Sequence, residues 1–303
     1  MALELFKGMN LLEFMDRFKD DESCREYLAH HKWSNGFTCR KCGCIEALNT
    51  TRKNIKQCKS CLDLESSTAG TMFHKVKFSL RKAFVMVYTM STTSKGSSGH
   101  NFAKTLSINK NTAWLFQQKI RAAMESSQLY PLKGKVVVDE AFIGGKEEGH
   151  QGRGSGTKQE IVIAIEATKN EDGIKRAYAM VIENTSSVEL KTIFDGHISK
   201  ESEVKTDKWS GYSPLKKDWD IQQEKSKGGE NFELMNRFVM GLKGWCRGIY
   251  HRVTGNYLQG YLNEYCYRFN RSIFKETAFD KLIQRMVLAK PIEYKLLKVK
   301  YLT

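Results

Sequence analysis

The stretch KVVVDEAFIGG, residues 135–145, contains a run of β-branched residues that ends in an acid. Val136, Val137 and Val138 favour a buried strand, which would carry Asp139 at its end. An acid in that place is either the solvated end of a strand or a carboxylate held rigidly to meet a metal ion or a substrate. Residues 203–207, EVKTD, repeat the pattern and end in Asp207, 68 positions after Asp139. We therefore predict that the two aspartates converge on one metal site.

The positive charge of the chain is large and unevenly distributed. Its 303 residues contain 49 Lys and Arg against 34 Asp and Glu, a formal charge of +15. No carboxylate occurs between Ser66 and Met124, where nine residues are basic, and residues 237–303 hold thirteen basic and four acidic residues. This surplus predicts a polyanionic partner, usually nucleic acid.

Length and hydropathy place the chain among soluble proteins of about two domains. It has no run of about 18 apolar residues, the length that a membrane helix needs. The amphipathic N-terminus, MALELFKGMNLLEFMDRF, contains acids and is unlike a signal peptide. We expect a cytoplasmic, nucleoid-associated protein that has no membrane partner.

Four of the eight cysteines form a regular pattern. Cys39 and Cys42 are followed, after fifteen residues, by Cys58 and Cys61. Two such pairs predict a ribbon that holds one structural Zn²⁺ through four thiolates, because a two-residue gap lets both sulfurs of a pair reach one ion. Cys44 is an alternative ligand, and coincidentally spaced buried cysteines are the alternative to a metal site. Either way, the usage favours a reducing compartment over disulfides.

The acid-free segment predicts three helices. Leu80 to Met90 is apolar, residues 100–106 form a short second helix, and a third begins at Thr112 after a turn. Two helices joined by a turn, in a segment without carboxylates, are typical of a helix-turn-helix module that lies against DNA phosphates. An ordinary three-helix packing unit would show the same apolar positions.

After Pro131 the pattern changes to strands. We predict strands over residues 136–142, 160–168, 175–184 and 203–207, with a helix over 188–197 that Ser186 or Ser187 opens. The glycine-rich loop over 144–156 lacks the spacing of a nucleotide-binding P-loop. The order indicates an α/β domain in which the second aspartate follows a helix.

A later helix, residues 232–245, supplies a candidate third ligand. Asn236 and Lys243 are seven residues apart, two helical turns, so both project on one face, and Arg247 lies near it. Two carboxylates and a weaker oxygen ligand suit two Mg²⁺ (or Mn²⁺) ions in phosphoryl transfer. Asn236 would offer an amide oxygen and Lys243 would position a phosphate. Glu230 and Glu233 are alternative acids for the third place.

These motifs resemble one known family: the bacterial insertion-sequence DDE transposases with an N-terminal zinc ribbon, related to the eukaryotic Merlin elements. The resemblance covers residues 10 to 271, and many relatives carry Glu where this chain has Asn236. The motifs that carry it are the two cysteine pairs, Thr112-Ala113-Trp114, Val138-Asp139-Glu140 with Ile143-Gly144-Gly145, Thr206-Asp207 with Gly211-Tyr212, Asn236 with Lys243, Arg247-Gly248 with His251 and Val253, and Tyr261 to Glu264 with Arg268 to Arg271.

The resemblance implies a ribonuclease-H-like catalytic domain, a mixed sheet flanked by helices, that cuts transposon ends and joins them to target DNA with magnesium. Its catalytic residues would be Asp139, Asp207, Asn236 and Lys243, the first three as metal ligands. The domains expected are an N-terminal helical segment (1–35), the zinc ribbon (36–66), the helix-turn-helix module (76–127), the catalytic domain (132–275) and a basic C-terminal helix (276–303). The DNA-contacting residues expected are Lys110, Asn111, Thr112, Lys119, Arg121 and Arg247.

Three hypotheses follow. The first is a DNA transposase that binds terminal inverted repeats, cleaves their 3′ ends and joins them to target DNA, acting on double-stranded DNA as a homodimer or larger assembly. The second is a catalytically inert, repressor-like derivative, an alternative that Asn236 leaves open. The third is a structure-selective nuclease of the same fold.

Overall fold

The computed structural model describes residues 6–7, 10–93, 95–144, 158–250 and 255–292. The chain divides into two units, one made of residues up to Met124 together with residues from Ile273, and one made mainly of Glu125–Ser272. The predicted glycine-rich loop lies, apart from Gly144, outside the described residues. No helix within the described ranges is both long and apolar enough to cross a membrane.

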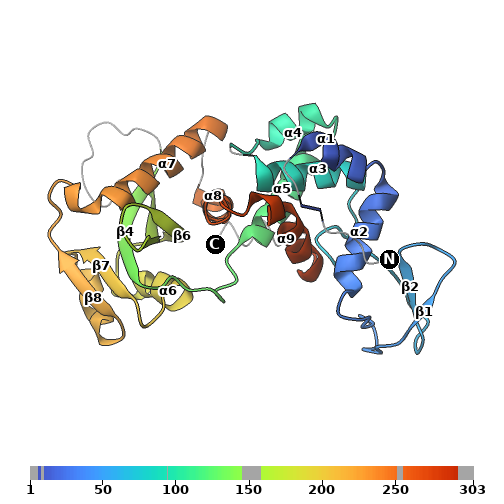
Figure 1. Cartoon of the computed structure of the whole chain (residues 1–303), viewed down its shortest axis with the longest axis horizontal. Coiled ribbons are helices and arrows are strands. Elements are labelled where there is room, and N and C mark those ends of the chain that lie inside the picture. Colours follow the sequence, from blue (N-terminus) through green and yellow to red (C-terminus); the bar gives the residue numbers. More distant parts are fainter. Residues whose placement is uncertain (1–5, 8–9, 94, 145–157, 251–254, 293–303) are drawn as a thin grey trace. The chain divides into compact units, whose positions relative to one another are not determined.

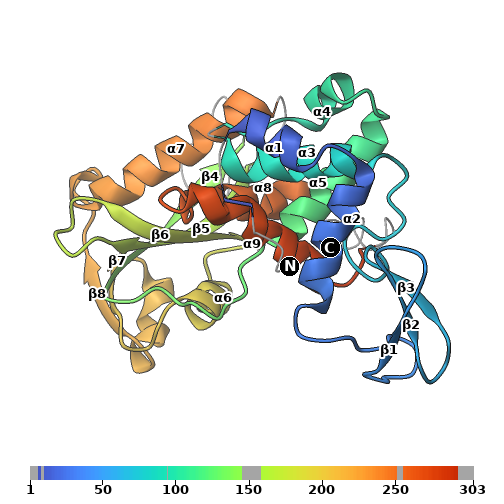
Figure 2. The same ribbon diagram turned by 45° about the vertical axis from the view of Figure 1, so that its right-hand side comes forward.

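The first unit is built of helices and a small sheet (Figure 2). Its elements are α1 (Leu11–Arg17), α2 (Asp21–Trp33), β1 (Ala47–Asn49), β2 (Ile55–Cys58), β3 (Leu64–Ser66), α3 (Leu80–Thr92), α4 (Gly99–Thr105), α5 (Lys110–Met124) and α9 (Lys275–Leu288). The three strands pair antiparallel in the order β1-β2-β3. The predicted helices over residues 80–124 are confirmed, and the last begins two residues earlier than expected because Asn109 accepts hydrogen bonds from the backbone N–H groups of Asn111 and Thr112.

The C-terminal helix α9 belongs to the core of the first unit. Phe279 is fully buried, and its ring lies 5.3 Å from that of Phe14 and 5.6 Å from that of Phe18. Beside it, Asp280 accepts a 2.6 Å hydrogen bond from the Tyr27 hydroxyl. The helix therefore offers one apolar face to α2, α3 and α5, and the five-part division drawn from the sequence stays a prediction.

The second unit is a five-stranded mixed sheet with helices on both faces (Figure 1). Its elements are β4 (Lys135–Ile143), β5 (Gln159–Ala167), β6 (Ile174–Ile182), α6 (Ser187–His197), β7 (Glu203–Asp207), a 3-10 helix η1 (Ser210–Lys217), β8 (Asp220–Glu224), a 3-10 turn η2 (Glu230–Phe232), α7 (Glu233–Ile249) and α8 (Gly255–Phe269). The strand order is β6-β5-β4-β7-β8, with β4, β5 and β6 antiparallel and β7 and β8 parallel to β4. This order and these directions are those of the ribonuclease-H-like fold that the resemblance implies.

Both faces of β4 are covered. Val136 and Val138 lie in a core with α6 and η1, and Ala141 and Ile143 lie in a second core with α7 and α8. Since side chains alternate along a strand, Asp139 points toward the α7 face and Glu140 toward the α6 face. The four strands and the helix predicted from the sequence are confirmed, with Ser186 as the N-cap of α6.

Candidate metal centres

Strand register places Asp139 level with Asp207. The parallel strands β4 and β7 pair Lys135 with Glu203, Val136 with Val204 and Val137 with Lys205, an offset of 68 residues. That offset equals the separation of the two aspartates, so the same register continued by two residues sets them side by side. The backbone pairing of β4 with β7 ends at Val137 and Lys205, two residues before the aspartates.

Three carboxylates meet at this place. One ligand oxygen from each of Asp139, Glu140 and Asp207 lies within 4.8 Å of the others, and all three residues are half-buried. Asp139 Oδ1 accepts the N–H of Glu140 at 2.9 Å, and Asp207 Oδ1 accepts the N–H of Trp209 at 3.0 Å. The oxygen-only donor set fits a hard divalent cation such as Mg²⁺ or Mn²⁺.

The turn after β7 holds Asp207 in place. The Trp209 indole N–H donates to the Thr185 carbonyl at 2.9 Å, and the Gln223 amide donates to the carbonyls of Asp207 and Trp209. A Cβ at Gly211 would lie 2.6 Å from the Thr185 carbonyl oxygen. Glycine is therefore required here for the close approach of two backbone segments.

Tyr212 lies on the α6 side of the sheet, near the three carboxylates. It is fully buried in the α6-side core, with its ring 6.2 Å from that of Phe194. Burial raises the pKa of Tyr212 well above its usual value, and the nearby negative charges of Glu140, Asp139 and Asp207 raise it further. Within the part of the chain that the structure describes, the Tyr212 hydroxyl has no hydrogen-bond partner. The hydroxyl therefore stays protonated and is a free donor close to the carboxylate cluster.

Asn236 is held by the turn that begins α7. Its Nδ2 donates to the Gly229 carbonyl at 2.9 Å, and Gly229 has a φ of 93°, where a Cβ would lie 2.7 Å from that Nδ2. This hydrogen bond uses the nitrogen of the amide and not its oxygen, which is the atom a divalent cation would bind. The ligand role of Asn236 stays a proposal.

Lys243 lies near two other positively charged residues, Arg247 and Lys158. It is half-buried on α7, and burial, followed by the charges of Arg247 and Lys158, lowers its pKa. Lys158 directly precedes β5, whose first residue Gln159 pairs with Ile143 at the end of β4. Positive charge therefore gathers at the end of the sheet toward which β4 runs.

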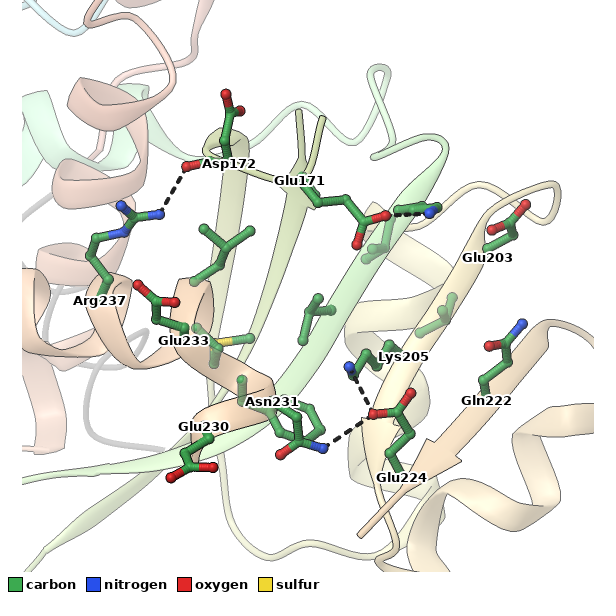
Figure 3. Close-up of a pocket in the computed structure, with 18 residues that line it drawn as sticks. Glu171, Asp172, Glu203, Lys205, Gln222, Glu224, Glu230, Asn231, Glu233 and Arg237 are labelled. Atoms are coloured by element: carbon green, nitrogen blue, oxygen red, sulfur yellow. Dashed lines mark hydrogen bonds and ion pairs between the residues drawn. The ribbon is translucent and has the colours of Figure 1, made fainter. Parts of the chain in front are cut away.

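Glu230 and Glu233, the alternative acids for the third ligand, lie in a separate pocket and not in the carboxylate cluster. Both line a polar pocket of about 550 Å³ between the start of α7 and the first residues of β4 and β7 (Figure 3). In it Lys205 pairs with Glu224 at 2.8 Å, and Arg237 donates to the Asp172 carbonyl at 3.2 Å. Within the described residues, neither glutamate joins the carboxylate cluster, so these two alternatives for the third ligand are not supported.

The four cysteines of the ribbon form a second cluster. Their sulfurs lie within 4.8 Å of one another, with 3.6 Å between Cys39 and Cys61 and 3.5 Å between Cys42 and Cys58. Tetrahedral zinc with Zn–S bonds of about 2.3 Å needs sulfurs about 3.8 Å apart. The N–H of Cys61 points at the Cys58 sulfur and lowers the pKa of Cys58 to about 6. The donor set fits a structural zinc ion.

Cys44 is not one of these ligands. Its thiol faces the Glu46 carbonyl at 3.7 Å, and it stands outside the group of four. The choice of Cys39 and Cys42 as the first pair is thus confirmed over the alternative.

The predicted DNA-contacting residues divide into exposed and buried groups. Lys110 and Asn111 are exposed and Thr112 is half-buried, all in the first turn of α5, and Arg247 is exposed on α7. Lys119 and Arg121 are buried, 9 % and 1 % exposed. The prediction is wrong for these two because the C-terminal half of α5 packs against α3 and α9, and Lys119 Nζ donates to the Met72 carbonyl at 3.3 Å.

Sequence reasoning missed Glu140 and Tyr212 as members of the site. Both stand inside motifs already singled out, Val138-Asp139-Glu140 and Gly211-Tyr212. Strand alternation argues against Glu140, since neighbours on a strand face opposite ways. Its carboxylate nevertheless lies within 4.8 Å of ligand oxygens of both aspartates, at a level of the sheet beyond the last paired residues of β4 and β7.

A ribonuclease-H-like sheet with aspartates on adjacent parallel strands, preceded in the sequence by a four-cysteine ribbon, is the combination that the resemblance to insertion-sequence transposases implies. The ISXO2-like transposase domain matches residues 131–270, and the transposase zinc-ribbon domain matches residues 19–63. Together they span more than half of the chain. The chain therefore belongs to the insertion-sequence transposases that carry this DDE-type domain and ribbon.

Individual relatives are more distant. An uncharacterised protein in the transposable element ISH50 of Halobacterium salinarum is 20 % identical over 217 residues, which cover 66 % of this chain and 72 % of that protein. Among solved structures, a pre-cleavage Mos1 transpososome has a TM-score of 0.30 and 9 % identity, over 69 % of this chain and 75 % of that one. A Mos1 paired-end complex with the left transposon end has a TM-score of 0.29 and 9 % identity, over 64 % and 75 %.

Proposed function

We propose that this transposase binds the terminal inverted repeats of an insertion sequence, cleaves their 3′ ends and joins them to target DNA by two-metal phosphoryl transfer. The observation that carries the proposal is the carboxylate cluster, in which a ligand oxygen of Asp139 lies within 4.8 Å of one of Asp207, close enough to share divalent ions. Two such ions would activate the attacking oxygen and stabilise the leaving one.

The other residues position DNA. Asn236 offers its amide oxygen as a third, neutral ligand, and its hydrogen bond to Gly229 fixes the plane of that amide. Lys243, with Arg247 and Lys158 near it, holds the phosphate backbone in line with the carboxylates. The half-buried Lys243 has little freedom to lose on binding.

The first turn of α5 is the proposed contact with DNA bases. Lys110 and Asn111 are exposed at an N-terminus where backbone N–H groups attract phosphate. Short α4 before it exposes Lys104, and no acid stands between Ser66 and Met124 to repel DNA. In helix-turn-helix proteins, the N-terminal residues of the second helix reach the bases.

The test is cleavage and strand transfer on a labelled DNA fragment that carries the element's terminal repeat, with Mg²⁺ or Mn²⁺. Asp139→Asn or Asp207→Asn should each lower strand transfer by about a thousandfold, the effect of about 4 kcal/mol in the barrier. Binding to the repeat in a gel-shift assay should persist. The matched control is Asp218→Asn, an exposed aspartate of the same unit, which should transfer like wild type.

Strand transfer at the wild-type rate in either catalytic variant would contradict the proposal. The active complex should contain two or more chains, since one transposition event joins two ends. Light scattering that finds one chain in the active complex would refute that assembly.

A further inference from the structure

Glu140 reaches the carboxylate cluster from the opposite face of the sheet. Asp139 belongs to the α7 face of β4, and Glu140 belongs to the α6 face with Val136 and Val138. Its carboxylate nevertheless comes within 4.8 Å of ligand oxygens on both aspartates. It does so at the place where β4 and β7 are no longer paired.

The second residue of the inference is Tyr212, which lies in the core on the α6 face of the sheet. Tyr212 is 0 % exposed in the core that α6 and η1 cover, and its hydroxyl has no hydrogen-bond partner among the described residues. The hydroxyl lies close enough to Glu140, Asp139 and Asp207 for their charges to act on it. The position of Tyr212 depends on Gly211, whose lack of a Cβ lets η1 approach Thr185. An apolar core that presents one donor to a carboxylate fixes the direction of that carboxylate.

We propose that Glu140 is a third carboxylate ligand of the metal centre and that Tyr212 is its positioning residue. The inference rests on the proposed function and deepens it. Two divalent ions bring four positive charges, and Asp139 with Asp207 supplies two negative ones. Asn236 supplies none, whereas Glu140 supplies a third, which raises affinity for hard cations.

The competing role for Glu140 is structural, as an acceptor for the Tyr212 hydroxyl alone. Glu140→Gln separates the two roles, because glutamine keeps an oxygen that accepts from Tyr212 and loses the charge that binds the ion. Glu140→Asp is the second variant, which keeps the charge on a shorter side chain. Glu203→Gln is the matched control, an exposed acid at the other end of β7.

The experiment measures Mn²⁺ binding to the full-length, zinc-loaded protein without DNA, from the loss of the electron paramagnetic resonance signal of free Mn²⁺. Glu140→Gln should weaken binding by about tenfold or more. Tyr212→Phe should weaken it by about fivefold, the worth of one hydrogen bond of about 1 kcal/mol. Glu140→Asp should fall between Glu140→Gln and wild type, and Glu203→Gln should bind like wild type.

Asp139→Asn in the same titration keeps the two proposals apart. If Asp139→Asn loses Mn²⁺ and Glu140→Gln binds it with wild-type affinity, the role of Glu140 is refuted and the catalytic centre stands. If wild type binds no Mn²⁺, or Asp139→Asn binds it with wild-type affinity, the proposed metal centre is refuted. The proposed role of Glu140 is then refuted as well. Urea unfolding of each variant shows that the fold is kept.

Discussion

His197 is the residue whose buried setting makes stability depend on pH. It ends α6, is 6 % exposed, and packs against Tyr178 with ring centroids 4.4 Å apart and ring planes tilted by 48°. Burial lowers the pKa of His197 to about 4, against a smaller opposing effect of the Glu125 charge. The folded state thus keeps the imidazole neutral at a pH where the unfolded chain protonates it.

We expect the free energy of unfolding to fall as the pH drops from about 6.5 to about 4. The unfolded state binds one more proton than the folded state in that window, so acid favours unfolding; above about 6.5 the contribution is fully present. The pKa difference corresponds to about 3 kcal/mol. His197→Phe should make this slope shallower by the contribution of one histidine in urea unfolding measured at a series of pH values.

The exposed His100 provides the control, since His100→Asn should keep the wild-type slope. Release of metal from the ribbon in acid affects all three proteins alike, so the difference between them reports His197. An unchanged slope in His197→Phe would contradict the expectation.

Among the elements, α8 and the residue that follows it cover one of the two edges of the sheet, the edge at β6. Strand β6 is at that edge, and its backbone groups would otherwise be open to another chain. Gln259 accepts the N–H of Val181 at 2.9 Å and donates to the Ala179 carbonyl at 3.2 Å. Asn270 accepts the N–H of Ala177 at 2.8 Å and donates to its carbonyl at 2.9 Å. The two amides act in place of a neighbouring strand.

Asn270→Ala should therefore destabilise the protein by about 2 kcal/mol, because it leaves two backbone groups of Ala177 without partners. The measurement is the urea midpoint of full-length protein followed by circular dichroism. Asn111→Ala, a substitution of an exposed asparagine on α5, should leave the midpoint unchanged. A midpoint for Asn270→Ala equal to that of wild type would show that water replaces the amide at this edge.

The elements that sequence patterns predict are those with a covered face. The valines of β4 and the alternation in β7 indicate strands because apolar residues repeat at the strand period. Strand β8, DIQQE, was missed because it is an edge strand with one buried residue, Ile221. Lys119 and Arg121 were expected to contact DNA because they are charged. Both are buried, since the charge of a residue does not reveal which face of α5 is packed.

Within the site, the sequence predicts which residues belong to one strand better than it predicts which side chains from different strands come into contact. The aspartates could be paired because each follows a β-branched, strand-like run. The prediction that Asp139 ends its strand is wrong, because β4 continues to Ile143, whereas Asp207 does end β7. The reach of Glu140 depends on where two strands part, and the place of Tyr212 depends on the fold of η1. Neither follows from local periodicity.

For the whole molecule, three features support the proposed DNA cleavage and strand transfer. The first unit carries a zinc ribbon and an acid-free helical module, and the second carries a carboxylate centre with positive charge at the end of its sheet. The position that separates an active enzyme from an inert derivative is Asn236, because a neutral amide binds a divalent ion more weakly than a carboxylate.

The most direct measurement is strand transfer by wild type, Asn236→Ala and Asn236→Glu on the terminal-repeat fragment with Mg²⁺ or Mn²⁺. We predict that wild type cuts and joins, that the alanine variant loses at least about tenfold in rate, and that all three bind the repeat equally. A wild type that binds the repeat tightly and never cuts, with Asn236→Glu restoring cleavage, would contradict the account and identify the chain as a DNA-binding derivative of a transposase.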